Sequence, residues 1–157
     1  MTALLPGTTV AITGVSGFLA SELCAQLLAR GVKVKGTVRS LSDPTRTEHL
    51  LALPGADTLL QLFEADLITN VAGFATAFEG CSVVFHTACP FHLAGTAEPL
   101  GEEYFVEPAV KGTVAILETV RTCNAAVRVV LTSSTSAMFK RLVEVSRALN
   151  SQALCTV

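Results

Sequence analysis

A glycine-containing turn between a short apolar run and a helix pattern constrains the fold of this chain more than any other feature. The run Thr9–Thr13 is rich in β-branched residues, which is typical of a strand buried on both faces of a parallel sheet. Directly after it comes the turn Thr13-Gly-Val-Ser-Gly-Phe-Leu-Ala20, and leucines then recur at helical spacing through residues 17–30. Gly31 stands where a helix usually ends. The order strand, turn, helix predicts the first unit of an α/β fold.

The same alternation continues along the chain. Further strands are expected at residues 32–38, 59–63, 82–87 and 127–133, with shorter helices at 44–53 and 71–78. A longer helix before residue 127 is expected to turn inward the side chains of Val110, Val114, Leu117 and Val120. Pro108 lies within that pattern and marks either the start of the helix or a kink. Five strands that alternate with helices predict a Rossmann-type doubly wound parallel sheet with right-handed crossovers.

Composition excludes several classes of protein. The 157 residues suit one domain, half of them are hydrophobic, and a net charge of -2 without a Lys/Arg cluster gives no surface for nucleic acid or an anionic membrane. Five cysteines without a C-x-x-C pair predict reduced thiols rather than a disulfide framework, and His86 and His92 lack partners at metal-ligand spacing. No targeting signal and no run of 18 apolar residues is present. We therefore expect a cytoplasmic protein with a small-molecule ligand and no metal.

The glycine turn has the chemistry of a phosphate-binding loop. Gly14 permits a tight turn, Gly17 allows backbone N–H groups to approach a pyrophosphate at the positive end of a helix, and Ala20 permits close packing of helix on strand. A turn that only caps a helix would also contain glycine, but the position between a strand and a helix favours a dinucleotide. The candidate cofactor-binding residues of this segment are Thr13, Gly14, Ser16, Gly17, Phe18 and Leu19.

The end of the second strand indicates which dinucleotide is preferred. An acidic residue there would bind the ribose 2′-hydroxyl of NAD, whereas an arginine accommodates the 2′-phosphate of NADP. The strand ends Thr37-Val-Arg-Ser40, and no acid follows until Asp43. Arg39 can offer a planar charged fork to the phosphate, and Arg46 would join it. The alternative to this phosphate-binding role is that Arg39 is a solvated loop residue. Of the two dinucleotides, the sequence favours NADP.

With these motifs in place, the sequence resembles the extended short-chain dehydrogenase/reductases, in the branch of the dihydroflavonol 4-reductases and cinnamoyl-CoA reductases. The resemblance runs from about residue 8 to residue 137. Six markers carry it in order: residues 13–20, Thr37-Val-Arg39, Ala65-Asp-Leu67, Val84-Phe-His-Thr-Ala-Cys-Pro-Phe91, Pro108-Ala-Val-Lys-Gly-Thr113 and Val129-Val-Leu-Thr-Ser-Ser134.

The resemblance implies further site residues and an activity. Asp66 and Leu67 would lie at the edge of the adenine, and five residues would line the cofactor farther along: Thr87, Ala88, Pro90, Thr132 and Ser133. Ser134 would be the catalytic serine that hydrogen-bonds a substrate carbonyl oxygen. The complete proteins of this kind reduce ketones or aldehydes by hydride transfer from NADPH.

The chain departs from this family in two places. The family's tyrosine, which donates a proton, and a lysine four residues on are absent, since the one tyrosine is Tyr104 and Lys140 is the only lysine after Ser134. Residues 1–137 are thus interpreted as the NAD(P)-binding domain, and 138–157 as a divergent tail without counterpart. Because apolar residues recur at helical spacing in the tail, we expect it to form an amphipathic helix. These residues are Met138, Leu142, Val145 and Leu149.

Three functions remain open on the sequence alone. The first is an NADP-dependent oxidoreductase chain that here is limited to cofactor binding, with a carbonyl substrate only in a complete form; a truncated or spliced product or an incorrect gene prediction would have this sequence. The second is a non-catalytic nucleotide-binding or protein-interaction module, in which self-association is possible. The third is an NAD-dependent epimerase or dehydratase relative, against which the position of Arg39 argues.

Overall fold

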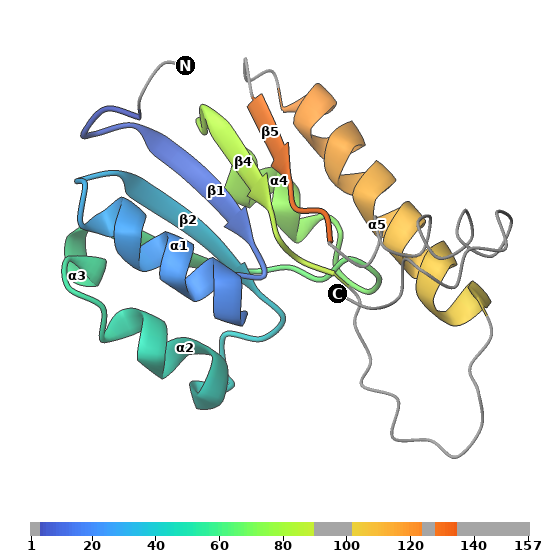
Figure 1. The fold of residues 1–157 in the computed structure, drawn as a ribbon, viewed down its shortest axis with the longest axis horizontal. Helices are drawn as coiled ribbons and strands as arrows, with labels where there is room; N and C mark the ends of the chain where they lie inside the picture. The colour runs from blue at the N-terminus through green and yellow to red at the C-terminus, as the bar shows by residue number, and fades with distance from the viewer. Residues whose placement is uncertain (1–3, 90–101, 124–127, 135–157) are drawn as a thin grey trace, which may run out of the picture.

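A five-stranded parallel sheet with helices on both faces forms the protein (Figure 1). The computed structural model describes residues 4–89, 102–123 and 128–134. The strands are β1 (Thr9–Thr13), β2 (Lys33–Val38), β3 (Leu60–Glu64), β4 (Val83–His86) and β5 (Arg128–Leu131). The helices are α1 (Phe18–Leu28), α2 (Pro44–Leu51), α3 (Ala56–Leu59), α4 (Gly73–Phe78) and α5 (Glu102–Thr122). The strand order β3-β2-β1-β4-β5 confirms the predicted Rossmann-type fold.

The strand order places the ligand-binding edge of the sheet. The chain moves outward from β1 through β2 to β3, then crosses to β4 on the other side of β1, so the direction of winding reverses between β1 and β4. In open parallel sheets, ligands bind at the carboxyl ends of the strands at such a reversal. Thr13 at the end of β1 pairs in register with His86 at the end of β4. The segments that follow these two residues therefore lie next to each other.

Each face of the sheet has its own hydrophobic core. Successive side chains of a strand point to opposite faces, so Val10 and Ile12 of β1 belong to one cluster while Ala11 belongs to the other. The first cluster packs α1 and α2 on the sheet, and the second packs α4 and α5. The first cluster requires glycine at position 36 of β2, because a Cβ on Gly36 would lie 2.6 Å from a methyl carbon of Val15.

The prediction that four side chains of α5 turn inward is wrong for three of them. Val110, Val114 and Leu117 are 55%, 52% and 47% exposed, and only Val120 packs against the core. Ile116 is instead fully buried, and the helix approaches the chain beyond β3 so closely at Gly112 that a Cβ there would lie 3.2 Å from Leu67. Helical spacing fits the predicted face and the observed face of α5 equally well. The small residue Gly112 permits the close approach and so decides which face turns inward.

Other sequence expectations differ from the structure by small amounts. Helix α5 begins at Glu102 and continues through Pro108, so this proline does not mark its start. The short helix α3 was not expected; Gly55 precedes it with a φ of +80°, which suits the glycine of the predicted Pro-Gly break.

No helix in the described part of the chain is both long and apolar enough to cross a membrane. The amphipathic helix expected in 138–157 falls outside the described residues.

Candidate functional site

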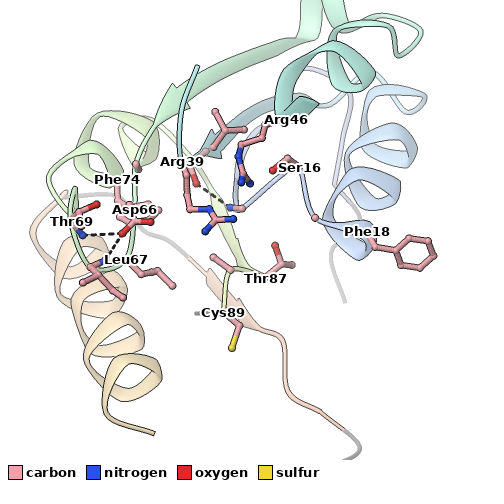
Figure 2. A pocket seen from close by; sticks show the side chains of 17 residues that line it. Ser16, Phe18, Arg39, Arg46, Asp66, Leu67, Thr69, Phe74, Thr87 and Cys89 are labelled. Atoms are coloured by element: carbon pink, nitrogen blue, oxygen red, sulfur yellow. Dashed lines mark hydrogen bonds between the residues drawn. The ribbon is translucent and has the colours of Figure 1, made fainter. Parts of the chain in front are cut away.

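A cavity of about 690 Å³ lies at the carboxyl ends of β1, β2, β3 and β4 (Figure 2). Six parts of the chain supply its walls. The β1–α1 turn and the β2 tip, with one residue of α2, contribute Gly14, Ser16, Gly17, Phe18, Thr37, Val38, Arg39 and Arg46. The chain beyond β3, the helix α4 and the chain beyond β4 contribute Ala65, Asp66, Leu67, Ile68, Thr69, Phe74, Thr87, Ala88 and Cys89.

The glycine turn is held in shape by the neighbouring strand β2. Gly14 has a φ of +64°, and a Cβ on it would lie 3.1 Å from the Cβ of Ala88, so both conformation and space require glycine here. Its N–H donates to Oγ1 of Thr37 at 3.1 Å, and the N–H of Val15 donates to the carbonyl of Thr37 at 2.9 Å. The N–H of Gly17 donates to the carbonyl of Gly14 at 3.0 Å. These three donors are used inside the protein and do not face a ligand.

The amino end of α1 keeps backbone donors for a ligand. Gly17 is its N-cap and no side chain caps the helix, so the first-turn N–H groups, including those of Phe18 and Leu19, have no intrahelical acceptor. The ring of Phe18 is 98% exposed and points away from the cavity in Figure 2. Any contact of Phe18 with a ligand is thus through its backbone. Such N–H groups at the positive end of a helix dipole bind phosphate.

A buried hydrogen-bond network joins the ends of β1 and β4 beneath the cavity. Oγ1 of Thr13 accepts from the N–H groups of Thr87 at 3.2 Å and Ala88 at 3.0 Å. These two bonds occupy both lone pairs of the hydroxyl oxygen, so its proton is donated to Nδ1 of His86 at 2.8 Å, which requires the tautomer with hydrogen on Nε2. Burial lowers the pKa of His86 and favours the neutral ring. Thr13 is itself fully buried and lies under the cavity rather than in its wall.

Two arginines occupy the cavity at the tip of β2. Arg39 follows the strand and forms no salt bridge with any described residue. Arg46 comes from α2 and donates through Nε to Oδ2 of Asp43 at 2.8 Å. Figure 2 shows both side chains reaching into the same part of the cavity, beside Ser16. Their positive charges make this end of the cavity suited to a phosphate.

The chain beyond β3 forms the opposite end of the cavity. Oδ1 of Asp66 accepts from the N–H groups of Ile68 at 2.8 Å and Thr69 at 2.9 Å, which fixes a turn (Figure 2). Burial of the Asp66 carboxyl opposes ionisation, but the backbone N–H donors of Thr69 and Ile68, the hydroxyl of Thr69 and the charge of Arg39 together lower its pKa. The carboxylate is therefore charged at neutral pH, and Leu67 and Phe74 add apolar surface beside it.

The cavity brings together most of the site residues predicted from the sequence, and a few lie elsewhere. Thr13, Leu19, Thr132, Ser133 and Ser134 are not in its wall, and Pro90 falls outside the described residues. Seven lining residues were missed: Thr37, Val38, Ala65, Ile68, Thr69, Phe74 and Cys89. All of these except Phe74 lie within two residues of a predicted site residue, so position alone would have suggested them. Phe74 reaches the cavity from α4, which no sequence signal indicated.

The part of the chain that the structure describes holds no group of three or more His, Cys, Asp or Glu side chains suited to a metal ion. Four of the five cysteines lie in that part, and none of these four forms a disulfide. Cys24 and Cys81 are buried, and burial raises the pKa of each thiol to about 11, so neither is a reactive thiolate near neutral pH.

Comparison with known proteins gives the family and the near relatives. Residues 11–148 match the family model described as GDP-mannose 4,6 dehydratase. A cinnamoyl-CoA reductase of Medicago truncatula is 44% identical over 132 residues, which are 84% of this chain and 39% of the relative. A dihydroflavonol 4-reductase of Solanum lycopersicum is 41% identical over 127 residues, which are 81% of this chain and 32% of the relative.

A solved structure agrees with these sequence matches. Gre2 of Candida albicans in complex with NADPH superimposes with a TM-score of 0.69 at 31% identity, covering 83% of this chain and 38% of that one. The chain thus spans between about a third and two fifths of the length of these relatives. The resemblance to the cinnamoyl-CoA reductase and dihydroflavonol 4-reductase branch is confirmed.

Proposed function

The chain belongs to the GDP-mannose 4,6 dehydratase family, and from this membership and its cavity we propose that it binds NADP(H) as a member of the carbonyl-reducing oxidoreductases. The relatives in the comparison are reductases, and one neighbour was solved with NADPH. The chain's own residues then have to account for the preference for NADP over NAD.

The two arginines at the tip of β2 carry this proposal. Arg39 and Arg46 both line the cavity, and the tip of the strand has no acidic side chain to receive a ribose 2′-hydroxyl. Contacts between arginine and phosphate are charge-assisted and roughly twice as strong as neutral hydrogen bonds. The 2′-phosphate that distinguishes NADP from NAD would meet these two guanidinium groups.

The remaining walls fit the rest of the dinucleotide. The uncapped amino end of α1 would bind the pyrophosphate through backbone N–H groups, and Gly14 and Gly17 let the backbone approach it. Asp66 and Leu67 would bind the adenine, and Thr87 and Ala88 would line the cofactor beyond β4. When bound, NADPH supplies a hydride for transfer to a carbonyl carbon.

We further propose that this chain by itself is limited to cofactor binding. Ser134 follows β5 and would hydrogen-bond a carbonyl oxygen, yet the sequence contains no Tyr-x-x-x-Lys to donate the proton. A non-catalytic nucleotide-binding or interaction module is favoured by the same absence. The epimerase or dehydratase alternative is favoured by the name of the family model and opposed by the arginines.

Two related proposals complete the assignment. Residues 1–137 would form the cofactor-binding domain, with 138–157 as a separate tail. A cytoplasmic location is supported by the cysteines, since none of the four that the structure describes is paired.

Calorimetric titration of the chain with NADPH and with NADH tests the proposed function. NADPH should bind roughly tenfold to a hundredfold more tightly, the range expected for charge-assisted contacts to the 2′-phosphate. Arg39→Ala should remove most of this preference. Arg30→Ala, which removes an exposed charge at the far end of α1, is the matched control and should leave it unchanged. Equal affinities for the two nucleotides in the unmodified chain would contradict the proposal.

A further inference from the structure

An acidic residue stands directly behind the arginine pair, and its place in the structure was not expected from the sequence. Asp43 precedes α2 and does not line the cavity, whereas Arg46, three residues later, does. An acid near a 2′-phosphate would ordinarily repel it and favour NADH. The hydrogen bonds of Asp43 indicate a different effect.

Both carboxylate oxygens of Asp43 are engaged in fixed directions. Oδ1 accepts from the N–H of Thr45 at 3.1 Å and from its hydroxyl at 2.6 Å, which caps the amino end of α2. Oδ2 accepts from Nε of Arg46 at 2.8 Å. The hydroxyl of Thr45 and the backbone of α2 therefore hold the carboxylate in place, and the carboxylate holds the arginine.

The choice of nitrogen determines what Arg46 can do. A guanidinium carries five N–H donors in one plane, and Asp43 takes only the one on Nε, nearest the side-chain stem. The two terminal nitrogens carry the other four donors, and Asp43 is the only described carboxylate within salt-bridge distance of the Arg46 guanidinium. Figure 2 shows this end of Arg46 turned into the cavity beside Arg39. The bond to Asp43 thus leaves the forked end available and limits its rotation.

We propose that Asp43 is a positioning residue for the cofactor's 2′-phosphate: it fixes Arg46 through Nε so that the terminal nitrogens face the phosphate, and it thereby raises selectivity for NADPH over NADH. This inference rests on the proposed NADP(H) site. The direct repulsion between Asp43 and the phosphate is small by comparison, because the carboxylate is paired with Arg46 and one third of its side chain is exposed to screening solvent.

The variant Asp43→Asn separates positioning from repulsion by the sign of its effect. Asparagine keeps one oxygen for the cap of α2 but places an amide NH₂ where Oδ2 stood, so it cannot accept from Nε while capping. It also removes a negative charge. Positioning predicts weaker binding of NADPH, and repulsion predicts tighter binding.

The experiment measures NADPH and NADH affinities by calorimetry for the unmodified chain, Asp43→Asn and the control Asp57→Asn. Asp57 lies in α3, is exposed and is outside the cavity wall, so its variant removes the same charge without touching Arg46. Asp43→Asn should weaken NADPH binding about three- to tenfold, part of the roughly tenfold to hundredfold that loss of a whole charge-assisted contact costs. Its NADH affinity should not change, and Asp57→Asn should change neither.

A second background isolates the path through Arg46. In a chain that already carries Arg46→Ala, the step Asp43→Asn should no longer weaken NADPH binding. The inference is overturned if Asp43→Asn strengthens NADPH binding, leaves it unchanged, or weakens both nucleotides equally. If the unmodified chain shows no preference for NADPH, the proposed function fails as well; a retained preference together with an unaffected Asp43→Asn overturns this inference alone.

Discussion

The hydroxyl of Thr13 is predicted to be among the most costly single groups to remove from this protein, and Thr13→Val removes it with little change of shape. The substitution leaves the N–H groups of Thr87 and Ala88 without their acceptor and Nδ1 of His86 without its donor. An unsatisfied buried polar group costs about 1–3 kcal/mol. Since Thr87 and Ala88 are half-buried and can recruit water while His86 is 3% exposed, we expect a total loss of about 2–4 kcal/mol.

Urea unfolding followed by circular dichroism measures this loss as a change in the free energy of unfolding. Thr13→Ser, which retains the hydroxyl and loses a methyl group, is the control and should lose no more than about 1.5 kcal/mol. A Thr13→Val protein within about 0.5 kcal/mol of the unmodified chain, the range of neutral surface substitutions, would refute the proposed network.

Three further predictions concern the fold and the turn. Burial lowers the pKa of His86 in the folded protein, so the unfolded chain binds the proton more readily. The free energy of unfolding should therefore fall as pH drops below about 6.5. Urea titrations at several pH values measure this decline, which should be smaller in a His86→Asn chain. Gly17→Val should abolish nucleotide binding while the circular dichroism spectrum stays unchanged. A Cβ at this position would lie 3.3 Å from the carbonyl oxygen of Gly14, and the branched side chain would block the approach of the phosphate. Normal binding by the folded variant would show that the turn does not hold phosphate. Ile116→Ala should cost about 2–5 kcal/mol, whereas Val114→Ala, on the exposed stripe of α5, should cost less than about 1 kcal/mol; equal losses in thermal or urea unfolding would contradict the orientation of this helix.

The strands and the conformation of the glycine turn could be predicted because their signals are local. A buried parallel strand is a short β-branched run, and the predicted range Thr9–Thr13 is the observed β1. The glycine turn is likewise specified by adjacent residues, and the positive φ of Gly14 agrees with the tight turn inferred for it.

The features that escaped prediction depend on contacts between distant segments. The orientation of α5 is determined by how closely Gly112 approaches Leu67, 45 positions earlier in the chain, and periodicity contains no information about that distance. The role of Thr13 beneath the site depends on His86 in β4, and the lining residue Phe74 reaches the cavity from α4. The direction of Arg46 depends on which of its nitrogens Asp43 accepts, which spacing alone does not determine.

A crystal structure of the chain grown with NADP⁺ would test the central claim most directly. Our account predicts density for the dinucleotide in the cavity, with the pyrophosphate at the amino end of α1 and the 2′-phosphate within hydrogen-bond distance of the guanidinium groups of Arg39 and Arg46. A dinucleotide bound elsewhere, or one in the cavity whose 2′-phosphate contacts neither arginine, would contradict it.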